Sequence, residues 1–148
     1  MSLMRGGALL VCGAIALAGV ACAPAAARDV VVVATDYAYE LPPEIAAGPV
    51  ALRLDNRGKV GHEMALGLLK AGVTQDSVLA YAAAGHDPGD LTDGVVGILI
   101  AAPGVEALGA LRADLLAGRT YMMICQFQDS DSLPPHIAMG MFASFVAK

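Results

Sequence analysis

The C-terminal stretch YMMICQFQDSDSLPPHIAMGMFASFV holds three residues whose side chains can bind a soft metal ion. Cys125 comes first, His136 follows after ten intervening residues, and Met141 follows after four more. Taken singly, a cysteine or a methionine here is most often a core residue, and the histidine a surface loop residue. Together they supply a thiolate, an imidazole and a thioether, which is most of the ligand set of a copper ion that changes oxidation state.

Such a site needs a second imidazole, and the chain offers two further histidines, His62 and His86. His62 follows the turn DNRGKVG at the start of a predicted strand, and that end of a sandwich can meet the strand end that carries Cys125. His86 lies in the polar stretch GHDPGD, where we expect it to be solvated. We therefore predict that His62, rather than His86, completes the set with Cys125, His136 and Met141.

The elements that must position these residues are mainly strands. Short apolar or alternating segments bounded by turn residues predict strands at 29–40, 49–56, from 62 onward, 94–101, 119–127 and 140–147. Segment 104–118 fits either a helix or a strand with a turn, and Gly109 favours the strand. One helix is predicted at 74–84, with Thr74 as its cap and Gly85 at its end. Together these strands and this helix predict an all-β fold, a Greek-key antiparallel β-sandwich with one inserted short helix.

The first 27 residues have the pattern of a secretory signal peptide. Arg5 precedes a long apolar run, and small residues lead to a cleavage point after Ala27. This pattern predicts one domain, residues 28–148, in a periplasmic or secreted protein. Two alternatives remain open: the run stays as a membrane helix, or Cys22 receives a lipid at the export cut and tethers the domain as a lipoprotein.

The number of cysteines and the net charge indicate which kinds of ligand and partner the domain can have. After removal of the signal only Cys125 remains, so no internal disulfide can form. A free thiol in an oxidising compartment is prone to oxidation, which is easier to understand if a metal occupies it. The formal net charge is −5, and losing Arg5 makes the domain more acidic. Because no basic stripe exists, we expect no nucleic acid partner.

These residues resemble the cupredoxins, the blue-copper family that includes plastocyanin and azurin. The resemblance rests on NRGKVGHE and on YMMIC followed by PPHIAMGMFASFV. Carried over, the two histidine ligands of the family fall on His62 and His136, its cysteine on Cys125 and its axial methionine on Met141. The resemblance implies one copper ion that cycles between Cu(I) and Cu(II), one-electron transfer, and a redox partner protein.

Two features depart from the small members of that family. The loop between Cys125 and His136 holds ten residues, where the small carriers have a very short one. The stretch from Met64 to Gly118 is also larger than a minimal member needs. Met139 remains an alternative to Met141 as the axial ligand, because strand alternation points both side chains the same way.

Two other functions stay open at this stage. A copper chaperone or storage protein could hold Cu(I) with the same histidine, methionine and cysteine side chains and exchange it with a copper-handling protein. A metal-free sandwich would act as an interaction module, and its cysteine and histidines would not converge. We do not expect an enzyme, because oxidases and nitrite reductases of related fold need more copper sites and more histidines than three.

Overall fold

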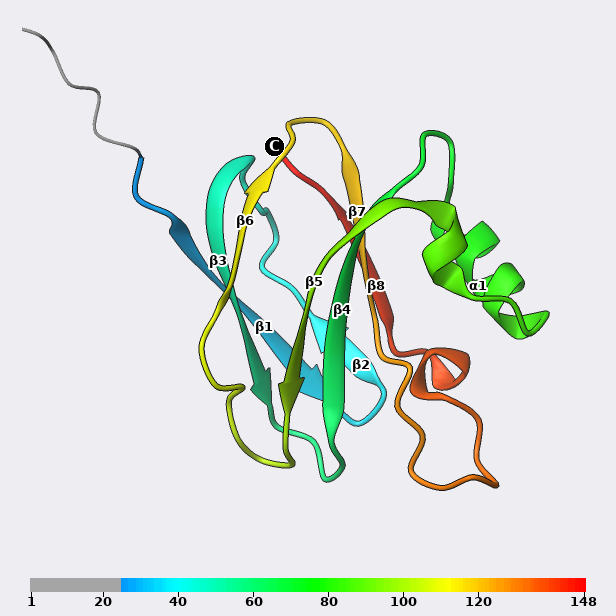
Figure 1. The fold of residues 1–148 in the computed structure, drawn as a ribbon. Coiled ribbons are helices and arrows are strands. Elements are labelled where there is room, and N and C mark those ends of the chain that lie inside the picture. The colour runs from blue at the N-terminus through cyan, green and yellow to red at the C-terminus, as the bar shows by residue number, and fades with distance from the viewer. Residues whose placement is uncertain (1–24) are drawn as a thin grey trace, which may run out of the picture.

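The computed structural model describes residues 25–148, which form two four-stranded sheets packed face to face (Figure 1). The first sheet has the order β2-β1-β3-β6 and the second the order β5-β4-β7-β8. The first contains β1 (Arg28–Thr35), β2 (Ala38–Glu40), β3 (Gly48–Asn56) and β6 (Leu111–Leu115). The second contains β4 (His62–Leu69), β5 (Thr92–Ala101), β7 (Thr120–Ile124) and β8 (Phe142–Val146). This two-sheet sandwich with one short helix confirms the predicted fold class.

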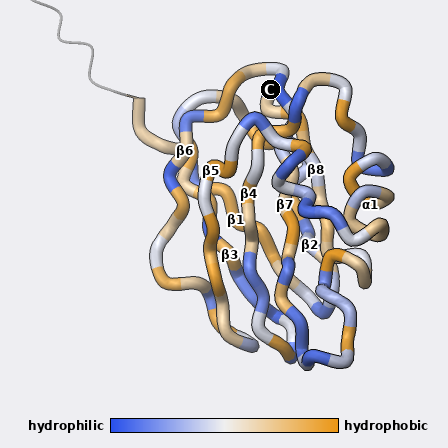
Figure 2. Tube along the Cα trace, turned by 45° about the vertical axis from the view of Figure 1, so that its right-hand side comes forward, coloured by the Kyte–Doolittle hydropathy of each residue, from blue (hydrophilic) through white to orange (hydrophobic). Residues whose placement is uncertain are grey.

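The core lies between the two sheets, and strand alternation explains how it forms. Side chains at alternate positions of a strand point to the same face, so apolar residues two apart can all be buried. Val50, Leu52 and Leu54 of β3 are buried in this way, while Arg53 points outward and pairs with Glu106. Figure 2 shows hydrophobic stretches along the strands and hydrophilic stretches in several connecting loops.

The first strand differs from its prediction. Segment 29–40 divides into β1 and β2, because Tyr37 between them has a φ of 65°, in the left-handed region that a strand cannot contain. β1 also pairs in parallel with β3, whereas the prediction was for antiparallel pairs throughout. In a parallel pair the second strand begins at the same end of the sheet as the first, so the chain must run back between them. Residues 36–47, including β2, make that return.

The helical segment lies outside the sheets, as predicted. Helix α1 (Gln75–Ala83) begins after Thr74, which forms a capping box with Ser77, and Gly85 follows its end with a φ of 83°. The 3-10 helix η1 (Pro88–Leu91) then leads into β5. Val78 of α1 is buried against Ile137 and neighbouring residues on the outer face of the second sheet. Segment 104–118, whose sequence fitted either a helix or a strand with a turn, forms turns and strand β6, as the second of these predictions stated.

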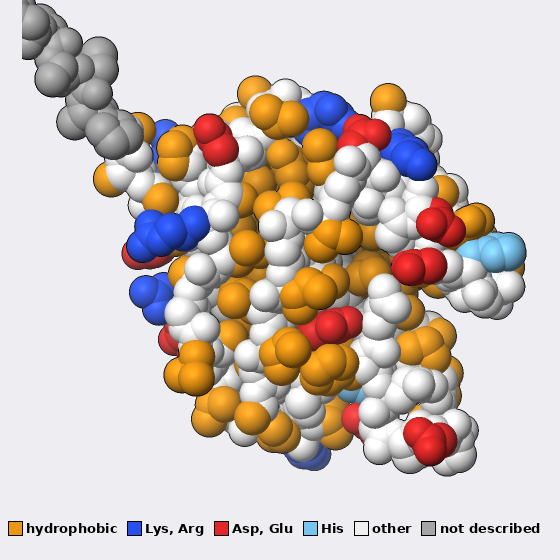
Figure 3. All heavy atoms as spheres, in the orientation of Figure 1, with side chains coloured by type: hydrophobic (Ala, Val, Ile, Leu, Met, Phe, Trp, Pro, Cys, Tyr) orange, Lys and Arg blue, Asp and Glu red, His pale blue; other side chains and the backbone are white. Residues whose placement is uncertain are grey.

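Helix α1 covers only part of that outer face. Figure 3 shows hydrophobic side chains spread over the exposed part, where β5 and β4 lie. Val95, Ile98 and Ile100 of β5 are all more than half exposed there.

Residues 1–24 lie outside the described residues, and with them most of the predicted signal peptide and Cys22. Among residues 25–148, no helix is long and apolar enough to cross a membrane.

Candidate metal centre

Strand pairing in the second sheet brings together two residues that lie far apart in the sequence. β4 and β7 are antiparallel neighbours, with Ala65 opposite Ile124. The first residue of β4 is His62, and the residue that follows β7 is Cys125, so both lie at the same end of the sandwich, the lower end in Figure 1. The sequence predicts this meeting, and the structure contains it. That the two residues bind a metal remains a prediction.

Backbone hydrogen bonds bring His136 to the same end. The amide of Ile137 donates to the carbonyl of Cys125 over 2.8 Å, and the amide of His136 donates to the carbonyl of Phe127 over 2.8 Å. These bonds close the neck of the loop formed by residues 126–135. Pro135 then holds extended backbone before the 3-10 helix η2 (His136–Met139). His136 is therefore the first residue of a helical turn. Pro135 restricts the backbone before it, and the hydrogen bonds at the loop neck fix its position.

The three side chains form a buried cluster of ligand atoms. The Nδ1 atoms of His62 and His136 lie 3.2 Å apart, and Sγ of Cys125 lies 3.3 Å from Nδ1 of His136. All three ligand atoms lie within 4.8 Å of one another, and all three residues are fully buried. Two imidazole nitrogens and one cysteine sulfur are the in-plane ligands of a blue-copper site. The residues present therefore fit a copper ion.

The hydrogen-bond partners of His136 also indicate that its Nδ1 can bind a metal ion. Nε2 of His136 lies 3.0 Å from Oδ1 of Asp129, and because a carboxylate only accepts, Nε2 carries the proton. Nδ1 of His136 then directs its lone pair at Nδ1 of His62. A proton on Nδ1 of His62, donated to this lone pair, or a metal ion between the two nitrogens would join them. A metal ion would thus replace a proton at this position.

Burial shapes the charge of each group in the cluster. It lowers the pKa of His62, which favours the neutral imidazole that binds metals. Burial also raises the pKa of the Cys125 thiol, although the backbone amides of Glu63 and Phe127 oppose this rise. The Glu63 amide lies 3.4 Å from Sγ and donates to it. A bound metal cation would supply the positive charge that a buried thiolate lacks.

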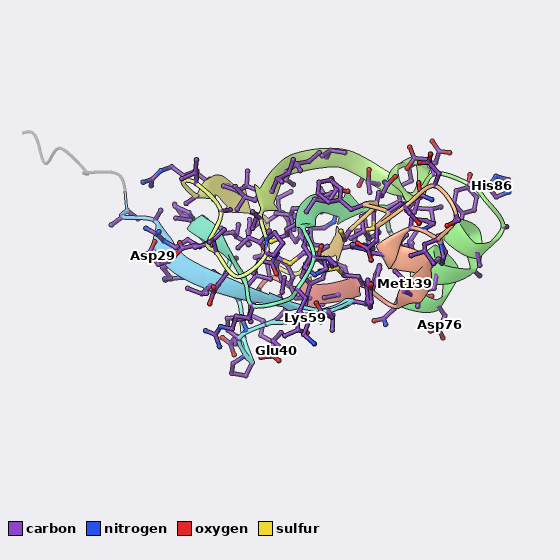
Figure 4. All side chains as sticks on the ribbon, turned by 90° about the horizontal axis from the view of Figure 1, so that it is seen from below. Asp29, Glu40, Lys59, Asp76, His86 and Met139 are labelled. Atoms are coloured by element: carbon purple, nitrogen blue, oxygen red, sulfur yellow. The ribbon has the colours of Figure 1, made fainter. Side chains whose placement is uncertain are left out.

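Burial separates Met141 from Met139. Met141 is fully buried and belongs to the core cluster that contains Cys125. Met139 is only half-buried, ends η2, and is labelled on that helix in Figure 4. Gly140 between them has a φ of 104°, so the segment is not a strand and the alternation that left both residues equivalent does not apply. Met141 therefore shares the buried core with Cys125, and its role as the thioether ligand remains a prediction.

His86 lies away from the cluster. It is exposed just beyond α1, and its ring lies 4.6 Å from that of Tyr81, measured between centroids. Figure 4 shows it at the outer edge of the molecule. The prediction that His86 is solvated is confirmed.

Sequence reasoning missed two residues that contact the cluster, Tyr37 and Asp129. The Tyr37 hydroxyl donates to Oδ2 of Asp129 over 2.6 Å, and the tyrosine ring lies edge-on to the imidazole of His136 at 5.0 Å between centroids. This hydrogen bond, followed by that from His136, lowers the pKa of Asp129. The only hint in the sequence was the unusual length of the loop that carries Asp129.

A glycine in the turn before β4 leaves room for His62. A Cβ atom at Gly58 would lie 2.6 Å from Oδ1 of Asp36 and 3.0 Å from Nε2 of His62. Asp36 cannot easily move, because Oδ1 accepts from the amide of Lys59 over 2.7 Å. At Gly61, in the same turn, the closest atoms to an added Cβ lie 3.9 Å away.

We therefore expect Gly58→Ala to displace the His62 ring and to weaken copper binding about tenfold, a loss typical of disturbed support around a metal ligand. Gly61→Ala is the matched control and should bind copper like the unaltered protein. Competition with a coloured Cu(I) chelator measures both affinities. Equal affinities for the two variants would contradict the steric role assigned to Gly58.

Comparison with known proteins adds information about the fold. No protein-family model and no curated protein sequence matches the chain. Among solved structures, it is similar to dithionite-reduced auracyanin from the photosynthetic bacterium Roseiflexus castenholzii, with 15% identity and a TM-score of 0.53, over 84% of this chain and 99% of that chain. It is also similar to auracyanin B, with 21% identity and a TM-score of 0.53, over 87% of this chain and 93% of that chain. At these identities the likeness concerns the fold.

Proposed function

We propose that this chain, which has the cupredoxin fold, binds one copper ion and transfers single electrons. His62, Cys125 and His136 would be the strong ligands, and Met141 would be a weaker thioether ligand. The observation that carries the proposal is the convergence of one sulfur and two Nδ1 atoms in a fully buried cluster. A metal-free interaction module would have no reason to bury these three side chains together.

A bound copper ion would supply the one-electron couple between Cu(II) and Cu(I). The protein residues then have separate tasks. The Cys125 sulfur provides a soft anionic ligand, and the two neutral imidazoles provide nitrogen ligands. The paired ends of β4 and β7 and the hydrogen-bonded loop neck hold these side chains in place. Little rearrangement of the protein would therefore follow a change in the charge of the copper ion. The Glu63 amide, donating to Sγ, stabilises negative charge on the sulfur.

We propose further that the protein works after export, in the periplasm or outside the cell, with a partner protein as electron donor or acceptor. The support is the signal-like pattern of residues 1–27, with lipid attachment at Cys22 as the tethered alternative. Expression of the full chain followed by N-terminal sequencing and intact mass would distinguish the cases. A free N-terminus at Arg28 supports export with cleavage, and a lipid-bearing Cys22 supports tethering.

A titration of the purified domain with Cu(II) tests the copper proposal. We expect an intense visible band at one equivalent, which ascorbate removes and an oxidant restores. A protein that stays colourless with Cu(II) yet binds Cu(I) would instead be a copper-handling protein. Met64, fully buried in the core cluster of Cys125 and Met141, would add a further soft side chain in that case. Binding of neither ion would contradict both functions.

The thioether ligand can be tested by paired substitutions. Met141→Leu should keep the colour, because a thioether would be a weak ligand beside a thiolate and two imidazoles, but should raise the reduction potential. Loss of the polar thioether to an apolar neighbour disfavours the more highly charged Cu(II) state. Met139→Leu is the matched control and should leave the potential unchanged. Spectroelectrochemical titration measures both, and the reverse result would assign the thioether to Met139.

A further inference from the structure

His136 is unusually well enclosed for a residue that follows an exposed loop. Residues 130–134 are all exposed, yet His136 has no exposed surface. Nε2 lies on the far side of the ring from Nδ1, which is the atom that contacts His62 and Cys125. Asp129 lies over Nε2, with Oδ1 at 3.0 Å, and its side chain is only 23% exposed. The loop thus folds back so that its own carboxylate covers the imidazole.

Tyr37 holds this carboxylate from the other sheet. Its hydroxyl donates to Oδ2 of Asp129 over 2.6 Å, so each carboxylate oxygen has its own donor. The tyrosine ring lies edge-on to both imidazoles, with centroid distances of 6.4 Å to His62 and 5.0 Å to His136. Tyr37 adopts its left-handed backbone conformation at a cost that a non-glycine residue accepts only where its surroundings enforce it.

We propose that Asp129, oriented by Tyr37, is the positioning residue for His136. Its first effect is on the tautomer: by accepting from Nε2, it keeps the lone pair on Nδ1 directed at the ligand cluster. Its second effect is electrostatic. A fixed negative charge beside a ligand stabilises the more positive oxidation state, so Asp129 favours Cu(II) over Cu(I). This inference rests on the proposed copper-binding function.

The proposal also accounts for the ten-residue length of the loop. Hydrogen bonds at the neck fix its two ends, and Gln128 donates to the carbonyl of Leu133 across it. These bonds leave enough chain for Asp129 to turn back and reach Nε2 of a residue seven positions later.

Three substitutions separate the two effects. Asp129→Asn keeps an oxygen acceptor and removes the charge, so we expect copper binding and colour to persist while the reduction potential rises. Asp129→Ala removes both, and we expect Cu(II) affinity to fall by about 10–100-fold. If the preference for Cu(II) over Cu(I) falls tenfold, the potential rises by about 59 mV. Tyr37→Phe keeps the ring and should give a smaller shift in the same direction.

Asp131→Asn is the matched control, because Asp131 is exposed in the same loop and its loss changes the net charge equally. We expect it to leave affinity and potential unchanged. An equal shift in this control would assign the effect to general loop charge and overturn the positioning role. Unchanged affinity and potential in Asp129→Ala would overturn it as well.

A measurement on the protein without copper keeps this test separate from the proposed function. Nitrogen-15 NMR of the imidazoles should show His136 protonated at Nε2, with a slowly exchanging proton that Asp129→Ala loses and Asp131→Asn keeps. A wild-type protein that binds no copper would contradict the proposed function, while the NMR result would still decide whether Asp129 orients the ring. A His136 protonated at Nδ1 in the wild type would overturn the inference.

Discussion

Replacing Cys125 by serine is expected to abolish the visible band of the Cu(II) protein completely. The intense colour of such sites arises from charge transfer between a thiolate and Cu(II), and a serine hydroxyl cannot supply it. Cys125 is the only free cysteine in the described residues, and it is fully buried with Sγ 3.3 Å from Nδ1 of His136. Serine is close to cysteine in size, so the fold should persist.

The measurement is the absorption spectrum of each variant at one equivalent of Cu(II), with circular dichroism to verify folding. A weaker Cu(II) signal from the two histidines should remain in electron paramagnetic resonance. The double replacement of Cys12 and Cys22 in the full chain is the matched control and should leave the colour unchanged. A band that survives in Cys125→Ser would exclude Cys125 as the ligand and with it the blue-copper assignment.

Replacing His62 by alanine is expected to weaken copper binding by more than the roughly 10–100-fold that loss of an outer supporting contact costs, since a direct ligand is removed. The neighbouring Nδ1 of His136 would lose the partner that lies 3.2 Å away. Any remaining Cu(II) would reach water through the space left by the ring, and the band should shift or bleach. Added free imidazole should restore part of the colour by entering that space.

His86→Ala is the control for the removal of a histidine. His86 is exposed and lies against the ring of Tyr81 in α1, so its loss should change stability by no more than about 0.5 kcal/mol and leave copper binding intact. Chelator competition gives both affinities. If His86→Ala lost copper and His62→Ala retained it, the ligand set inferred from the fold would be wrong.

Local sequence was sufficient for most of the elements and for part of the site. Strand alternation in 49–56 and the cap at Thr74 depend on neighbours within a few residues, and the structure has both where the sequence placed them. The same holds for the order cysteine, histidine, methionine near the C-terminus. Cys125, His136 and Met141 lie in one loop and its flanking residues, and so the likeness to a copper site could be inferred early.

Pairing between distant segments was beyond local sequence. The sequence suggested that His62 could meet Cys125, but only the antiparallel pairing of β4 with β7 brings them together. The parallel pairing of β1 with β3 was missed for the same reason. Alternation fixes which face of a strand is buried, but it does not specify the neighbouring strand, because that choice depends on the packing of the whole core.

The tertiary structure alone decided the surroundings of the ligands. Met141 and Met139 were equivalent by alternation until Gly140, in its left-handed conformation, broke the strand between them. Asp129 looked like an ordinary loop carboxylate, and Tyr37 like a strand residue. Their contact joins positions 92 residues apart in the chain, and it exists because the sandwich brings a turn of one sheet against a loop of the other. Hydrogen bonds of this kind are set by three-dimensional proximity, which no local pattern encodes.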